Sequence, residues 1–137
     1  MNMNHFLDWA LRLIPAGIVG QTLPFKFLGK EESVQIFRSL ADGIGLPTTL
    51  EPALRLGTGS LELIAIVLLL LPATARWGAI AASGLMAGAL LSHLTILGFS
   101  GPAGPLAILA ALALAFLGTW LFLNLRQEGG SHKMAVS

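Results

Sequence analysis

The sequence predicts an all-α integral membrane protein, a four-helix transmembrane bundle with a short amphipathic helix at the membrane interface between the first and second spans. The stretch from Trp77 to Phe99 contains no Asp, Glu, Lys or Arg, and it is longer than the roughly 20 apolar residues that an α-helix needs to cross a bilayer. The 137-residue chain is 55% hydrophobic and only 11% charged, whereas soluble domains carry about 25% charged residues. This composition leaves too little polar surface for a water-soluble fold.

Four stretches are long and apolar enough to be spans: residues 6–27, 52–71, 77–99 and 105–125. The turn around Pro72 is short, and so is the Gly- and Pro-rich hairpin that ends at Pro105. A proline is well placed in the first turn of a helix. Because short connections make neighbouring helices antiparallel, these spans are expected to form an up-and-down bundle.

The longer connection between the first two spans contains the predicted interfacial helix. Its apolar residues recur at helical spacing: Val34, Phe37, Ala41 and Ile44. Residues 1–128 are expected to form one domain. The polar residues 129–137 have little to bury and are expected to be a disordered tail.

Charge and cysteine content exclude several classes of function. The formal net charge is only +1, so the chain lacks the basic field that nucleic-acid binding requires. It contains no cysteine, which excludes disulfides, thiolate metal sites and thiol redox chemistry on its own side chains. The first residues lack the basic region of a signal peptide, so the first span is expected to stay in the protein.

The basic residues do not orient the bundle, because each side of the predicted spans carries four of them. Acidic residues gather in the long first connection: Glu31, Glu32, Asp42 and Glu51. They favour placing this connection on the non-cytoplasmic side of the membrane, with both termini in the cytoplasm.

Glu62 lies in the middle of the second span, where a charged carboxylate costs about 2.5–3.5 kcal/mol unless it is paired. Arg12 lies at a similar depth in the first span, counted from the same side of the membrane. We therefore predict an ion pair between Arg12 and Glu62. This could be a structural ion pair that fixes the two helices in register, or it could be part of a functional site.

Further polar residues mark a track into the bundle from the opposite side. Lys26 and Arg55 lie near its mouth, and Gln21 and His93 lie deeper. Together with Glu62 they are candidates for binding a small amphipathic ligand. A metal site is not expected, because one histidine and one carboxylate on different helices do not make a ligand set.

Each of these residues also has a structural interpretation. Lys26 and Arg55 could extend to lipid headgroups, and His93 could hydrogen-bond a neighbouring helix. Gln21 could satisfy a carbonyl group left without its donor by Pro24. The Gly84-x-x-x-Gly88 motif predicts close helix packing, either within the chain or in a homo-oligomer.

Several motifs together resemble the DoxX family of small bacterial four-helix membrane proteins, over residues 11–123. They are Leu11–Ile14, Gln21–Phe27, Arg55–Ala65, Leu69–Pro72, Gly84–Ala89 and His93–Thr95. The resemblance implies a bacterial inner-membrane location. It also implies that the polar positions of the family correspond to Arg12, Lys26, Glu62 and His93.

The family takes its name from a subunit of a thiosulfate:quinone oxidoreductase, and related proteins have been linked to redox and sulfur metabolism. The resemblance therefore implies an accessory subunit of a quinone-linked membrane redox system, with no stand-alone enzymatic activity. The partners implied are the lipid bilayer and a redox protein. A bound quinone is the expected cofactor, with no group attached covalently.

Two other functions stay open from the sequence alone. The chain could bind an amphipathic ligand or lipid in a polar pocket inside the bundle, or it could be a purely structural subunit that binds partner proteins. A transporter is disfavoured, because four spans without inverted repeats lack the usual transporter architecture.

Overall fold

The computed structural model describes residues 3–136, and all regular structure in this range is helical. The α-helices are α1 (His5–Gly20), α2 (Leu23–Phe27), α3 (Glu31–Gly43), α4 (Glu51–Leu70), α5 (Ala75–Ser92) and α6 (Ala103–Val136). A short 3₁₀ turn, η1 (Thr48–Leu50), precedes α4, and a π-helical turn, η2 (His93–Leu97), follows α5. The all-α prediction is confirmed.

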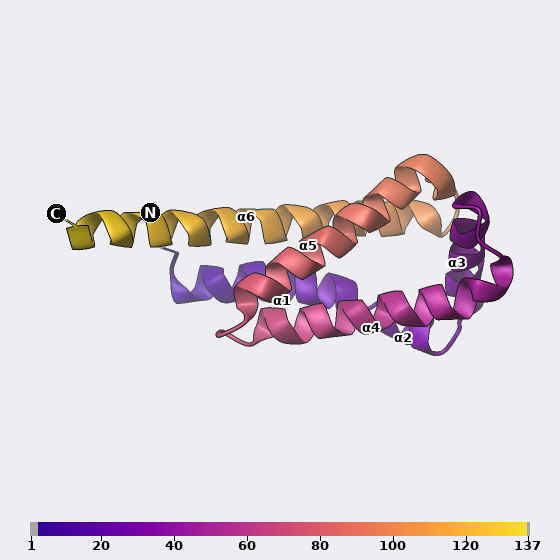
Figure 1. Cartoon of the computed structure of the whole chain (residues 1–137), viewed down its shortest axis with the longest axis horizontal. Helices are drawn as coiled ribbons and strands as arrows, with labels where there is room; N and C mark the ends of the chain where they lie inside the picture. The colour runs from indigo at the N-terminus through magenta and orange to yellow at the C-terminus, as the bar shows by residue number, and fades with distance from the viewer. Residues whose placement is uncertain (1–2, 137) are drawn as a thin grey trace.

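Helices α1, α4, α5 and α6 pack side by side, and α3 lies across one end of them (Figure 1). In this bundle α4 packs against α1 and α5, and α6 packs against α1 and α5. Helix α5 begins beside α4 and crosses toward α6, so that α4 and α5 diverge toward α3 (Figure 1). Helix α1 begins, and α6 ends, at the opposite end of the bundle from α3.

Three helical stretches are long and apolar enough to cross a membrane: Thr48–Leu70, Ala75–Leu97 and Ala103–Val136. Many large side chains on them are exposed on the outside of the bundle, among them Ile64 at 56% and Ile108 at 63%. Exposed apolar side chains of this size suit a surface that faces lipid tails rather than water. Three of the four predicted spans are thus present at full length.

The first predicted span, residues 6–27, is divided in the structure. Helix α1 has 16 residues, about 24 Å of helix, which is shorter than the roughly 30 Å hydrocarbon core. The Thr22 hydroxyl donates to the carbonyl of Val19 at 2.8 Å where α1 ends, and Pro24 stands in the first turn of α2. Pro24 has no N–H to donate to the carbonyl group of Gly20, so the hydrogen bonds of α1 do not continue past it, and a proline is well placed in the first turn of a new helix.

The predicted interfacial helix is present as α3, which buries Ser33, Phe37 and Ala41 and packs against α4 and η2. The expected disordered tail is not seen. Helix α6 instead continues through residue 136, and Ser137 lies outside the described residues. Extending an existing helix costs little free energy, because the unfavourable step of helix nucleation has already taken place.

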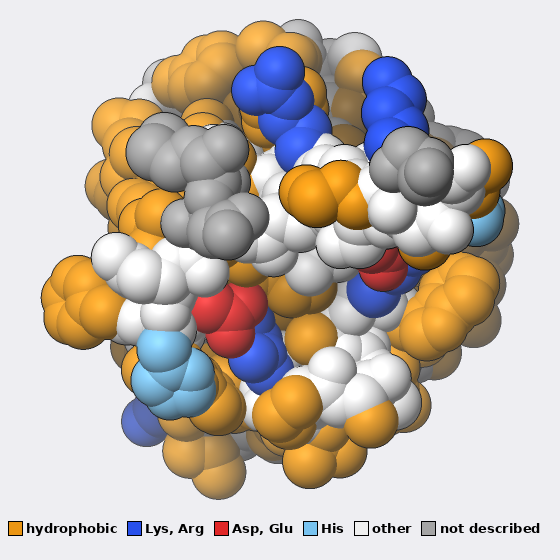
Figure 2. All heavy atoms as spheres, turned by 90° about the vertical axis from the view of Figure 1, so that its left-hand side faces the viewer, with side chains coloured by type: hydrophobic (Ala, Val, Ile, Leu, Met, Phe, Trp, Pro, Cys, Tyr) orange, Lys and Arg blue, Asp and Glu red, His pale blue; other side chains and the backbone are white. Residues whose placement is uncertain are grey.

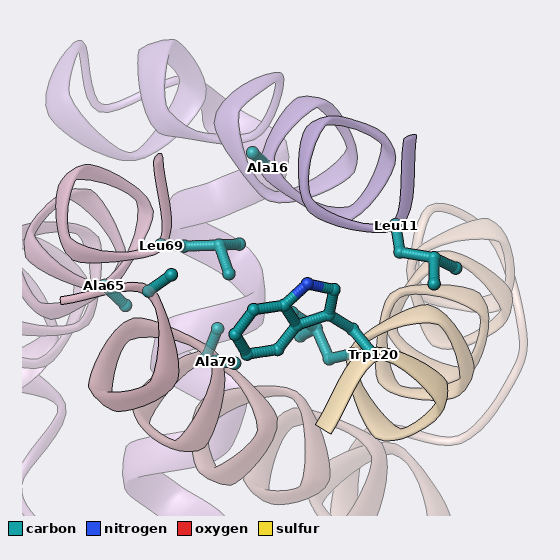
Figure 3. Packing of buried hydrophobic residues seen from close by; sticks show 9 residues of the cluster. Leu11, Ala16, Ala65, Leu69, Ala79 and Trp120 are labelled. Carbon is teal, nitrogen blue, oxygen red and sulfur yellow. The ribbon is translucent and has the colours of Figure 1, made fainter. Parts of the chain in front are cut away.

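The core at the end of the bundle opposite α3 is built mainly from small side chains around one large ring. The Trp120 indole lies among Leu11, Leu69 and Ala79, all of them buried (Figure 3). Helices α4 and α5 are in close contact at Gly78, where an added Cβ would overlap the backbone of α4. Small residues allow membrane helices to pack in this way.

The surface at this end of the molecule is divided between apolar and charged side chains. Hydrophobic side chains form most of its outer rim, and acidic and basic side chains adjoin one another nearer the middle (Figure 2). Charged groups that meet between helices, with apolar groups outside, are the arrangement expected for a bundle surrounded by lipid.

Candidate functional site

A cavity of about 650 Å³ lies where α3 closes the bundle. All six α-helices contribute to its wall, which is mostly apolar. Its volume is within the range of about 300–1,000 Å³ that is usual for sites that bind small molecules. Four of the five predicted ligand-binding residues line it: Gln21, Lys26, Glu62 and His93.

A charge pair between Lys26 and Glu62 forms the polar part of the cavity. The Lys26 Nζ lies 2.7 Å from the Glu62 Oε2 and also donates to the Thr22 hydroxyl oxygen at 2.8 Å. The side chains of Lys26 and Glu62 are only 13% and 5% exposed. The break after α1 allows this contact, because α2 packs against α4 and brings Lys26 to the depth of Glu62.

The predicted ion pair between Arg12 and Glu62 is therefore wrong. Buried Arg12 donates instead to the carbonyl oxygens of Leu69 and Leu70, from Nε and from a terminal nitrogen, each at 2.8 Å. These carbonyls belong to the last turn of α4, whose acceptors have no partner within the helix and carry the negative end of its dipole. The guanidinium of Arg12 is a cap for α4.

Two further contacts fix Arg12 in this position. It forms an ion pair with Asp8 at 3.1 Å, one turn earlier on α1, and its guanidinium lies 4.5 Å from the centre of the Trp9 ring. The second oxygen of Asp8 accepts the indole N–H of Trp120 at 2.7 Å. Arg12 and Asp8 thus join α1, α4 and α6 at the end of the bundle far from the cavity.

Arg55 is the one ligand-binding candidate that does not line the cavity. It forms an ion pair with buried Glu51, one turn earlier on α4, and its guanidinium donates to the backbone carbonyl of Lys26. Gly29, with a φ of +63°, packs against the same guanidinium. Arg55 therefore positions the end of α2, and with it Lys26.

His93 is buried at the start of the π-helical turn η2. Its Nδ1 lies 3.3 Å from the carbonyl oxygen of Gly98, which leaves the second ring nitrogen, Nε2, available to another partner. π-Helical turns are rare and occur frequently at functional sites. The predicted bond from His93 to a neighbouring helix is replaced by this bond to the end of its own turn.

Gly84 and Gly88 do not have the packing role that the sequence predicted within the chain. Apart from the adjacent backbone of α5 itself, no atom lies within 4 Å of a Cβ added at either position, and both residues are exposed. They line the cavity instead.

Comparison with known proteins identifies the family. The model of the family described as methylamine utilisation protein MauE matches residues 7–103. The chain belongs to the MauE family. This family is part of the DoxX-like clan of small membrane proteins, so the resemblance to DoxX proteins is confirmed at the level of the clan. No curated protein and no solved structure matches the chain.

The part of the chain that matches the MauE family contains most of the site. It runs from α1 to the first residue of α6, and it includes Gln21, Lys26, Glu62 and His93. The apolar wall that α6 contributes to the cavity lies outside the match.

Proposed function

We propose that this MauE-family protein is a non-catalytic membrane component of a redox-enzyme system, and that it binds a quinone-like molecule in the cavity beside α3. The family is described by its part in methylamine utilisation and is associated with the maturation of methylamine dehydrogenase. The protein has no cysteine, so any thiol chemistry in such a system would be carried out by a partner protein.

The observation that carries the proposal is the buried pair of Lys26 and Glu62 in the wall of an apolar cavity. An ammonium group has three N–H donors, and Lys26 uses two of them on Glu62 and Thr22. The third donor, the Nε2 of His93 and the amide of Gln21 could hold the carbonyl oxygens of a quinone. A bound quinone would supply the electron-accepting chemistry.

An apolar wall with a few polar groups is the usual composition of sites for small amphipathic molecules. In this cavity Met86, Leu106 and Leu109 are among the apolar wall residues. They would cover the ring of such a molecule, whereas Lys26 and Glu62 would fix its orientation. The chain's own residues thus bind and orient the ligand and exclude water from it.

We further propose that the protein lies in a bacterial inner membrane with both termini in the cytoplasm. The acidic residues of the first connection support this orientation, and α1 begins at the same end of the bundle as α6 ends (Figure 1). The cavity then lies in the outer half of the membrane, close to a partner protein outside the cytoplasm.

Helix α6 favours a second function, that of a structural subunit. With 34 residues it is about 51 Å long, whereas the hydrocarbon core is about 30 Å thick. Glu128 still reaches Arg76 on α5, whereas the last turns of α6, which carry Lys133, extend beyond the other helices (Figure 1). Such an extension could bind a partner whether or not the cavity holds a ligand.

Mass spectrometry of solvent extracts from the detergent-purified protein tests the proposal. We expect close to one quinone per wild-type chain and lower occupancy in Glu62→Gln and His93→Ala. Glu128→Gln makes the same chemical change as Glu62→Gln, but at an exposed ion pair with Arg76 on α5, and should keep wild-type occupancy. Circular dichroism checks that each variant is folded. Bulk phospholipid alone in wild type and variants would contradict the quinone site and favour the structural subunit.

A further inference from the structure

The cavity is open on the outer surface of α5. Gly84 and Gly88 line it, and both are exposed. They are one turn apart on the helix, so they lie on the same face. Since neither position has a neighbouring atom within 4 Å of an added Cβ, the space next to these glycines is empty of protein.

This opening lies at the depth of the lipid tails. The candidate span that contains it is Ala75–Leu97. Gly84 is about 13 Å from Ala75 along the helix, and Gly88 is about 13 Å from Leu97, at roughly 1.5 Å per residue. Both glycines are therefore close to the middle of a span that crosses a core about 30 Å thick. A molecule that enters here comes from the hydrocarbon region, because no water is present at this depth.

The polar groups line other walls of the same cavity. His93 is more than one turn closer than Gly88 to the end of the span that α3 covers, and Lys26 and Glu62 face the cavity from α2 and α4. The cavity thus connects hydrogen-bonding groups on α2, α4 and η2 with apolar surroundings at the glycines. The divergence of α4 and α5 toward α3 leaves room for it (Figure 1).

We infer that Gly84 and Gly88 form a lateral entrance, through which a membrane lipid with a long apolar chain and an oxygen-bearing head enters the cavity from the bilayer. The head binds at Lys26 and His93, and the chain passes over the glycines into the surrounding lipid. This inference rests on the proposed function and restricts its ligand, because a short water-soluble quinone would need no opening at this depth.

Close packing of a second copy against the two glycines is the other use of such a motif. The structure favours a lipid chain because the glycines are continuous with a cavity that contains a buried charge pair. A helix seated on a flat glycine face would need no such cavity behind it.

Filling the entrance tests the inference. Gly88→Leu adds a side chain at the opening, and Gly57→Leu on α4 is its matched control. Gly57 is also helical and exposed, and no atom lies within 4 Å of its added Cβ, but it does not line the cavity. Both changes remove a helix-destabilising glycine, so their intrinsic effects on helix stability should be similar.

The assay uses decylubiquinone, a benzoquinone with a ten-carbon chain, as the probe. Delipidated protein is incorporated into liposomes that contain it and purified again, and the retained quinone is measured. We expect Gly88→Leu to retain about tenfold less than wild type, because its side chain occupies the path of the lipid chain. Gly57→Leu should retain as much as wild type.

The outcomes separate the inference from the function on which it rests. Wild-type protein that retains no probe would contradict the quinone site itself. Equal retention by wild type and Gly88→Leu would overturn only the lateral entrance. A wild-type dimer that Gly88→Leu converts to a monomer, with the probe still retained, would show that the glycines pack between two copies and would also overturn the entrance.

Discussion

Replacing Lys26 with methionine tests the charge pair inside the cavity. The change leaves the Glu62 carboxylate unpaired in a site where its side chain is only 5% exposed. Removing one partner of a buried ion pair typically costs about 3–5 kcal/mol of folding free energy. Glu62→Leu should cost a similar amount, because it leaves the ammonium group of Lys26 without its carboxylate.

The double variant should recover much of this loss. With both charges gone, the cavity wall is apolar and no unpaired charge is left in it. We therefore expect a coupling free energy of about 2–3 kcal/mol between the two positions, within the range of about 0.5–3 kcal/mol known for groups in direct contact.

Arg12 supplies the matched control cycle. Its carbonyl partner Leu69 is seven residues from Glu62 along α4, a distance of about 10 Å. Changes this far apart usually add within about 0.3–0.5 kcal/mol. Arg12→Leu should therefore be destabilising, because it uncaps α4, but it should show almost no coupling with Glu62→Leu.

Both cycles can be measured on delipidated protein, by following far-UV circular dichroism while SDS is titrated into dodecylmaltoside micelles. The free energy of unfolding is obtained for the wild type, the single variants and the double variants. If the coupling between Arg12 and Glu62 proved as large as that between Lys26 and Glu62, Lys26 could not be the specific partner of the Glu62 carboxylate.

Two further predictions concern packing and orientation. Gly78→Ala should lower the free energy of unfolding by about 1–3 kcal/mol, because its methyl group would overlap the backbone of α4. Gly84→Ala is the control and should not lower it, because its methyl group would enter open space. A Gly78→Ala protein as stable as wild type would contradict the close packing of α4 and α5. Because the chain has no cysteine, Thr48→Cys and Ser131→Cys each provide one thiol for a membrane-impermeant maleimide. Thr48→Cys should react in intact spheroplasts and Ser131→Cys only after permeabilisation, and the opposite pattern would refute cytoplasmic termini.

Hydropathy predicted the long spans closely because their ends coincide with turn residues. The second span was expected over residues 52–71 and α4 covers Glu51–Leu70, where Pro72 prevents continuation. The break in the first span escaped prediction, because residues 6–27 contain no polar stretch long enough to divide a span and hydropathy does not register backbone geometry. Pro24 was visible in the sequence, but an isolated proline in a membrane helix is often tolerated.

The polar residues of the site could be found from the sequence, but their partners could not. The predicted ion pair was based only on depth along the membrane normal, at which Arg12 and Glu62 are similar. The rotation of each helix about its axis and the return of α2 toward α4 decide the actual contacts, and neither can be derived from depth. The pairs of Asp8 with Arg12 and Glu51 with Arg55 were accessible in principle, because oppositely charged residues four apart meet on one face of a helix.

The cap that Arg12 places on the last turn of α4 affects how the protein is made. A ribosome delivers residues 5–20 to the membrane well before residues 69 and 70, so the guanidinium arrives before the carbonyl groups that will bind it. Until then an arginine inside the bilayer costs free energy, and a helix of 16 residues is too short to span the hydrocarbon core. Stable placement of α1 is therefore expected to follow the synthesis of α4, so that of these two helices the one translated earlier is the later to reach its final place.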